Sequence, residues 1–153
     1  MAEQGFTLTS PAFAHNDTIP LVHTCDGENS QPVLGWMHAP SGTKSFALIM
    51  DDPDAPAGTF THWVLFDIPA GSARLAGNGA GLGGRNDFQH DHYGGPCPPP
   101  KHGQHRYFFR LYALDVKSLG LPAGAKRADV EQAMEGHVLG TAELIGRYGR
   151  KTG

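Results

Sequence analysis

Acidic residues and a histidine lie close together between two short apolar runs, residues 46–50 and 63–66. A carboxylate beside an imidazole stabilises the protonated ring and fixes its orientation. Asp52 and Asp54 could therefore act with His62 in binding or in acid–base chemistry. Aspartate before proline also commonly caps its own turn, and the spacing alone favours neither role. We take this corner as the centre of the predicted site.

A second candidate segment is the glycine- and proline-rich stretch of residues 93–100. Proline has no N–H group, so Cys97 is the only backbone donor between Pro96 and Pro100. The glycines, Gly95 among them, add N–H groups that a ligand can approach closely. A rigid loop with a few directed N–H groups suits an anion such as phosphate. The alternative is a structural polyproline segment packed on the domain.

A third candidate segment precedes the strongest predicted strand, residues 107–114. In an extended chain His105 and Tyr107 share one face, so both could reach the same ligand. Arg106 points to the opposite face, where we expect it to pair with an acidic residue.

Other chemistries are less well supported. A nucleophilic Cys97 with a histidine base is conceivable, but nothing in the sequence directs the thiol toward a histidine. The exposed-looking His90, His92 and His102 lack the paired second half of a metal site. We therefore expect no catalytic residue, metal or cofactor. A weak hydrolase that uses Asp52, His62 and His105 as acid and base remains an alternative.

Length and composition point to one domain, residues 1–153, with many turns: the chain has 21 glycines and 12 prolines. A formal charge of -3 without a basic run argues against nucleic-acid binding. No run is long enough to span a membrane, and the first five residues do not resemble a signal peptide. Cys25 and Cys97 lie far apart in sequence, so we expect reduced thiols and a cytoplasmic location.

The apolar pattern predicts mostly strands, as expected of a β-sandwich-like domain with a peripheral helix. Residues 71–84 are expected to form a surface excursion and residues 85–100 a long ordered loop. Residues 142–148 could be helix or strand. The predicted strands are residues 6–9, 19–22 (an edge strand), 33–37, 45–50, 61–68 and 107–114, and the predicted helix is residues 128–135.

Taken together, these segments resemble the phosphatidylethanolamine-binding protein family, which includes the Raf kinase inhibitor protein, and its shorter bacterial and archaeal branch in particular. The resemblance covers almost the whole chain. Gln89, His92 and Lys101 stand where bacterial relatives often have glycine. The matching motifs are Asp52-Pro53-Asp54-Ala55-Pro56, Thr61-His62-Trp63, Tyr93-Gly94-Gly95-Pro96-Cys97-Pro98-Pro99 and Gly103-Gln104-His105-Arg106-Tyr107.

The resemblance implies a mostly β fold of two antiparallel sheets packed as a β-sandwich, with one or two small peripheral helices. It also implies a pocket for phosphate-like anions or phospholipid headgroups. The residues from Gly95 to Cys97 would supply N–H groups, and Pro56 and Pro98 would form walls. The remaining lining residues would be Asp52, His62, His105 and Tyr107.

The expected function is therefore non-enzymatic binding of a phosphorylated or otherwise anionic small molecule. A proton on His62 or His105 would add a charge-assisted hydrogen bond to the anion. Relatives of this family also suggest kinase-inhibitor-like regulation. The alternative is a protein-interaction module that inhibits a protease or kinase, with the pocket only modulatory. Homodimerisation is plausible because short relatives often pair.

Overall fold

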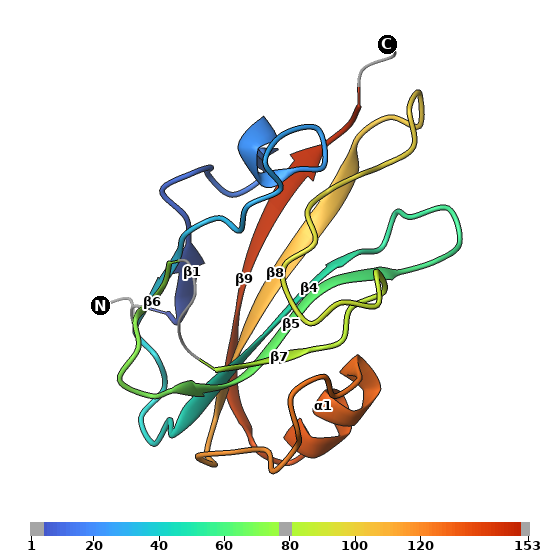
Figure 1. The fold of residues 1–153 in the computed structure, drawn as a ribbon. Coiled ribbons are helices and arrows are strands. Elements are labelled where there is room, and N and C mark those ends of the chain that lie inside the picture. The colour runs from blue at the N-terminus through green and yellow to red at the C-terminus, as the bar shows by residue number, and fades with distance from the viewer. Residues whose placement is uncertain (1–4, 77–80, 151–153) are drawn as a thin grey trace.

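Two β-sheets of unequal size form the molecule (Figure 1). The computed structural model describes residues 5–76 and 81–150. In that part of the chain the larger sheet has the strand order β2-β9-β8-β4-β5-β7 and the smaller sheet the order β1-β3-β6. The strands are β1 (Thr7–Thr9), β2 (Asp17–Thr18), β3 (Leu34–Met37), β4 (Ser45–Asp52), β5 (Phe60–Pro69), β6 (Arg74–Leu75), β7 (Leu82–Gly84), β8 (His105–Leu114) and β9 (Val138–Tyr148), and the helices are the 3₁₀ helix η1 (Leu21–His23) and α1 (Arg127–Met134).

The central strand β4 is buried along its whole length, which explains its continuous apolar run. Its side chains alternate between two layers of core. Phe46, Leu48 and Met50 pack in the cluster shared with the smaller sheet. Ala47 and Ile49 pack in the second cluster, with residues of α1. The larger sheet is therefore covered by the smaller sheet on one face and by α1 on the other.

The predicted fold class is confirmed: the described chain is mostly β, with two sheets and short helices. Residues 142–148 are strand, as part of β9. The helix predicted at residues 128–135 is α1, and Gly136 follows it with a positive φ of 80°, as expected at the end of a helix. No helix in the described ranges is long and apolar enough to cross a membrane.

The structure differs from the prediction in three details. Residues 19–22 do not form a strand, because Pro20 ends the short strand β2 and precedes the turn of η1. Moreover, β2 pairs with β9 in parallel, whereas the other strand pairs in the described ranges are antiparallel. The predicted excursion at residues 71–84 contains β6 and β7, and its residues 77–80 lie outside the described chain.

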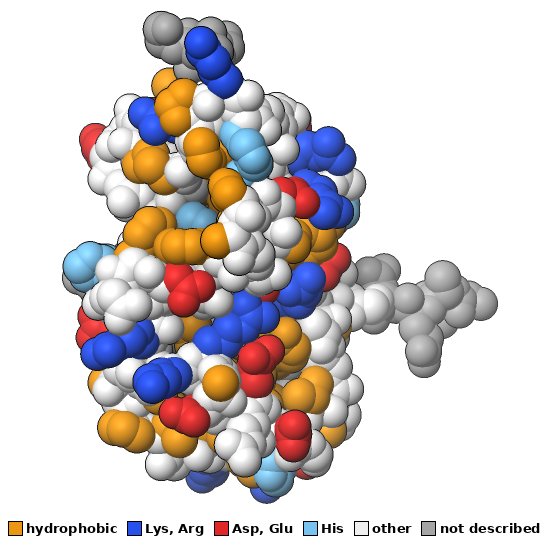
Figure 2. All heavy atoms as spheres, turned by 90° about the vertical axis from the view of Figure 1, so that its right-hand side faces the viewer, with side chains coloured by type: hydrophobic (Ala, Val, Ile, Leu, Met, Phe, Trp, Pro, Cys, Tyr) orange, Lys and Arg blue, Asp and Glu red, His pale blue; other side chains and the backbone are white. Residues whose placement is uncertain are grey.

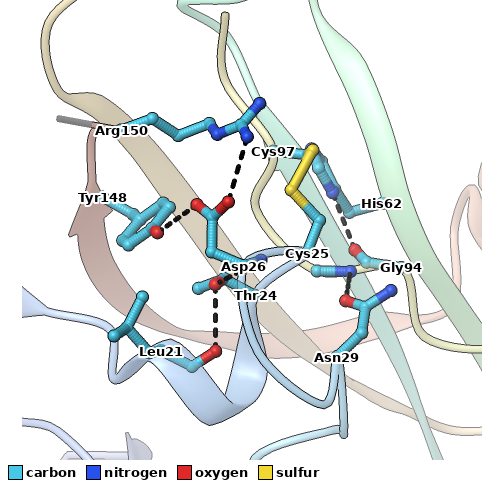
Figure 3. The surroundings of a disulfide bond; sticks show 11 residues. Leu21, Thr24, Cys25, Asp26, Asn29, His62, Gly94, Cys97, Tyr148 and Arg150 are labelled. Atoms are coloured by element: carbon cyan, nitrogen blue, oxygen red, sulfur yellow. Dashed lines mark hydrogen bonds and ion pairs between the residues drawn. A yellow bond between two sulfur atoms is a disulfide. The ribbon is translucent and has the colours of Figure 1, made fainter. Parts of the chain in front are cut away.

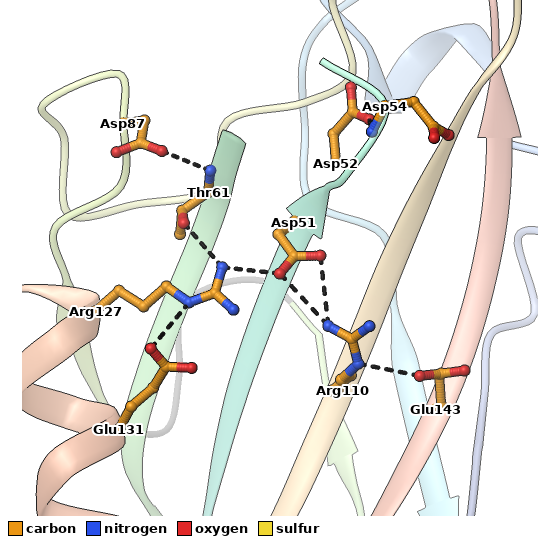
Figure 4. Close-up of polar contacts among 9 residues, drawn as sticks. All are labelled: Asp51, Asp52, Asp54, Thr61, Asp87, Arg110, Arg127, Glu131 and Glu143. Carbon is orange, nitrogen blue, oxygen red and sulfur yellow. Dashed lines mark hydrogen bonds and ion pairs between the residues drawn. The ribbon is translucent and has the colours of Figure 1, made fainter. Parts of the chain in front are cut away.

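A buried carboxylate joins α1 to the larger sheet (Figure 4). Asp51 lies near the end of β4 with 3% of its surface exposed. The nearest guanidinium nitrogen of Arg127 is 2.8 Å from its carboxylate, and that of Arg110 is 3.4 Å away. Glu131 and Glu143 in turn pair with these two arginines. A buried charge is tolerated only when it is compensated, so Asp51 makes the docking of α1 depend on Arg127.

We predict that Arg127→Met lowers the free energy of unfolding by about 2–3 kcal/mol, since Arg110 still compensates part of the buried charge. Denaturant unfolding would measure this. Arg147→Met, a change of the same type at an exposed position of β9, should change stability by less than about 0.5 kcal/mol. Adding Asp51→Asn to Arg127→Met should recover part of the loss. Equal stability of the two single variants would contradict the role of Arg127 in compensating the buried charge of Asp51.

Candidate functional site

A cavity of about 210 Å³ opens where the ends of β4, β5 and β8 meet the proline-rich loop. Figure 2 looks onto this side of the molecule, and in its upper half hydrophobic side chains surround histidines. Seven of the eight residues predicted for the site line the cavity; Gly95 does not. The lining residues are Asp52, Ala55, Pro56, Phe60, His62, Phe88, Cys97, Pro98, Pro99, His105 and Tyr107.

Strand order brings the polar residues together. Asp52 is the last residue of β4, which lies between β5 and β8. His62 belongs to β5, while His105 and Tyr107 begin β8 and alternate onto the same face. The rings of His62 and Tyr107 meet edge to face, with centroids 5.3 Å apart. Three sequence segments therefore contribute to one cavity.

Asp52 and His105 form a buried pair. The Nδ1 atom of His105 lies 2.6 Å from Oδ2 of Asp52, and their side chains are 2% and 4% exposed. The other carboxylate oxygen accepts the N–H of Asp54 at 2.8 Å. This arrangement fixes both the carboxylate and the imidazole, with the Nδ1 proton of His105 directed at Asp52.

His62 is held in one tautomer. Its Nδ1 atom lies 2.7 Å from the carbonyl oxygen of Gly94, so Nδ1 carries the proton and donates, leaving Nε2 with a lone pair. Burial lowers the pKa of His62, and the hydrogen bond to Gly94 opposes this only in part. We expected a proton on either His62 or His105, and burial disfavours it on His62. At neutral pH the His62 ring is therefore neutral, and its Nε2 atom can accept a hydrogen bond.

The N–H groups of Gly94 and Gly95 in the proline-rich loop donate to other parts of the protein and are not free for a ligand. Gly94 donates its N–H to the carbonyl of His62 at 3.1 Å. Gly95 donates to Oδ1 of Asn29 at 2.8 Å, so the prediction that Gly95 offers a free N–H is wrong. A Cβ on Gly95 would lie 2.2 Å from the carbonyl oxygen of His23, which explains why glycine is needed. Of the predicted loop donors, Cys97 alone both lines the cavity and donates its N–H to no described residue.

A disulfide joins Cys25 to Cys97 and holds the cavity wall against the loop after η1 (Figure 3). The N–H of Cys25 also donates to the carbonyl of Pro96 at 3.1 Å. The prediction of two reduced thiols is therefore wrong, because separation in sequence does not measure distance in the fold. The cytoplasmic location that we expected from reduced thiols loses this support and stays a prediction. A Cys97 thiolate nucleophile is likewise removed by the disulfide.

Arg106 pairs with an acidic residue, as predicted. Its guanidinium contacts both carboxylate oxygens of Asp54, at 2.9 and 2.8 Å. Hydrogen bonding to Arg106 lowers the pKa of Asp54 to about 2. Asp54 does not line the cavity, so this carboxylate braces the turn beside the site.

Several site residues were not predicted. Phe88 packs edge to face on His62, with ring centroids 5.3 Å apart. Asn86 donates through Nδ2 to the carbonyls of His62 and His92, while its Oδ1 accepts two further backbone N–H groups. Asn29 supports Gly95, as described above. Within residues 5–76 and 81–150, no group of three or more histidine, cysteine or acidic side chains is placed to hold a metal ion.

We predict that Cys25→Ser, which opens the disulfide without altering a cavity residue, lowers the free energy of unfolding by about 4 kcal/mol. The bond closes a loop with a sequence separation of 72 residues, and the entropy that it removes from the unfolded chain grows with loop length. Denaturant unfolding of this variant and of the reduced wild-type protein should give the same loss. A loss below about 1 kcal/mol in both would contradict a structural role for the bond.

Comparison with known proteins agrees with this geometry. Residues 9–149 match the family model described as phosphatidylethanolamine-binding protein. A UPF0098 protein of Aquifex aeolicus is 53% identical over 92% of this chain and 86% of its own length. A Mycobacterium tuberculosis protein that carries the name lipoprotein LppC is 39% identical over 96% of this chain and 74% of its own length.

The solved structures show the same relationship. The crystal structure of a phosphatidylethanolamine-binding protein homologue from Chlamydia trachomatis superposes with a TM-score of 0.91 at 35% identity. The match covers 97% of this chain and 99% of that one. The family model and the relatives span the segments that build the cavity. The chain therefore belongs to the phosphatidylethanolamine-binding protein family.

Proposed function

We propose that this protein is a non-enzymatic binding protein whose cavity takes a phosphate-like anion, either free or as part of a phospholipid headgroup. The observation that carries the proposal is the buried Asp52–His105 pair at the wall of a small cavity. Asp52 accepts the Nδ1 proton of His105, so a proton carried on Nε2 as well would make this ring a charge-assisted donor to an oxyanion. The Cys97 N–H, which donates to no described residue, supplies a further donor.

The charge of the cavity limits the charge of the anion that can bind in it. Its lining contains the Asp52 carboxylate but no lysine or arginine, so a dianion is poorly matched. The neutral His62 presents the Nε2 lone pair, which requires a donor from the ligand. A phosphomonoester monoanion meets both conditions, because it has one negative charge and keeps one P–OH group. We therefore propose that the monoanion is the bound form.

The chemistry of the lining favours binding over hydrolysis. Cys97 is oxidised in the disulfide. Burial, with the charge of Asp52 and a hydrogen bond to it, raises the pKa of Tyr107 far above its usual range, so a phenolate nucleophile is disfavoured. Asp52 is engaged with His105. A hydrolase that uses Asp52, His62 and His105 would need water as its nucleophile, and phosphoester turnover that His62→Phe abolishes would favour it over our proposal.

The disulfide is evidence on the cellular compartment in which the protein is found. Structural disulfides persist mainly in oxidising compartments, with the interiors of hyperthermophiles as an exception. We therefore favour an oxidising compartment over the cytoplasmic location expected from the sequence, in keeping with the name lipoprotein carried by the mycobacterial relative. Thiol trapping in intact cells followed by fractionation would test this: a cytosolic protein with both thiols free would overturn it.

We predict that the affinity for methyl phosphate falls as pH rises, by up to about tenfold per pH unit above pH ~6, where a phosphomonoester loses its second proton. The bound monoanion becomes scarcer, and since burial lowers the pKa of His62, the Nε2 acceptor for its P–OH group is still present as pH rises. Isothermal titration calorimetry between pH 5 and 8 would measure this. An affinity that is constant or rises with pH would contradict binding of the monoanion.

We also predict that His62→Phe weakens binding of methyl phosphate at pH 5.5 by about tenfold or more, since a hydrogen bond to a charged ligand is lost. The pH dependence should become shallower as well, because the acceptor for the P–OH group is gone. His90→Phe makes the same chemical change on an exposed loop and should bind like the wild-type protein. Equal affinities of the two variants would remove His62 from the site.

A further inference from the structure

A third side chain extends the Asp52–His105 pair toward solvent. The Nε2 atom of His105 lies 2.6 Å from Nδ1 of His102, and the two ring centroids are 4.8 Å apart. His105 is 2% exposed, whereas His102 lies on the surface. The contacts therefore run from a buried carboxylate, through a buried imidazole, to an exposed one.

These contacts use both ring nitrogens of His105. Its Nδ1 proton is directed at Asp52, so only Nε2 is left for another partner. A ring nitrogen makes one well-directed hydrogen bond, either donated or accepted. While His102 holds Nε2, His105 has no N–H to offer a ligand oxygen in the cavity.

The backbone places His102 in this position. The His102 N–H donates to the carbonyl of Pro99 at 3.2 Å, with Pro100 second and Lys101 third in the turn. Lys101 has a φ of 67°, and this combination is typical of a type II turn. Pro99 itself lines the cavity. His102 is thus carried on a turn whose first residue is part of the cavity wall.

We propose that His102 is a further residue of the binding site, which occupies Nε2 of His105 in the empty cavity and competes with the ligand oxygen for it. This inference rests on the proposed function. His102 lies outside the cavity lining, so it acts through His105 rather than by touching the ligand. It determines which ligands bind, since only an acceptor strong enough to displace an imidazole gains the His105 N–H.

Acid should release the contact. One proton can lie between the two imidazoles, but when both rings are fully protonated their N–H groups face each other and the hydrogen bond is lost. Asp52 faces the pair from the end of β4 and accepts the Nδ1 proton of His105. The other titratable or charged groups around the pair are His62 from β5, Asp54 from the turn after β4, Arg106 and Tyr107 from β8, Tyr148 opposite His105 in β9, and Lys101 in the turn.

His102→Ala tests the competition. At pH 6.5, where the phosphate monoanion is abundant, the variant should bind inorganic phosphate about tenfold more tightly than the wild-type protein, the value of one ordinary hydrogen bond. At pH 5 the two affinities should converge. Phosphate titrates identically in both experiments, so the ratio of affinities at each pH reports the protein alone. His92→Ala, which truncates an exposed histidine elsewhere on the loop, should leave both affinities unchanged.

A second measurement reports the contact without a ligand. In protein labelled with ¹⁵N-histidine, NMR should detect scalar coupling between Nδ1 of His102 and Nε2 of His105 at pH 8, and its loss on acidification. Absence of this coupling, or equal or weaker phosphate binding by His102→Ala at pH 6.5, would overturn the inference and leave the proposed function standing. Failure of the wild-type protein and both variants to bind phosphate at any pH would overturn the proposed function, and the competition with it.

Discussion

The constraint on which the site depends is the abrupt end of a strand that is buried on both faces. β4 runs as uninterrupted apolar residues and then places two carboxylates, Asp51 and Asp52, in surroundings that exclude water. Because side chains alternate along a strand, the two carboxylates face opposite layers. Each must be compensated where it lies. Arg127 and Arg110 compensate Asp51 on the helix side, and His105 compensates Asp52 on the side of the cavity.

Compensation of a buried carboxylate thus has a different result at Asp51 and at Asp52. Around Asp51 the charges are permanent, since arginine stays protonated, and the result is an anchor for α1. Around Asp52 the partner is an imidazole, whose proton can be shared with a further group. The binding proposal and the role of His102 both depend on this difference in chemistry between neighbouring residues of one strand.

Apolar patterning predicted most of the strands and the helix, because both core layers impose it directly. The resemblance to a family predicted that one cavity is lined by Asp52, His62, His105 and Tyr107. No local sequence pattern indicates that β4 lies between β5 and β8. The disulfide and the His102 contact were not predicted, because each depends on where a loop crosses the fold. The protonation of His62 was misjudged because burial, which decides it, is a property of the assembled layers. The interruption at Pro20 has a local cause, because proline has no N–H to donate to the neighbouring strand.

The parallel pairing of β2 with β9 affects the order in which the molecule can be completed. Asp17 lies opposite Gly146, and His105 at the start of β8 lies opposite Tyr148 near the end of β9. Contacts between segments so distant in sequence form slowly, because a long chain must first be closed into a loop. During synthesis the edge of β8 that carries His105 stays unpaired until the final strand has left the ribosome. The buried position of His105 is therefore completed late, and a chain that stops short of β9 lacks the strand that pairs with this edge of the cavity wall.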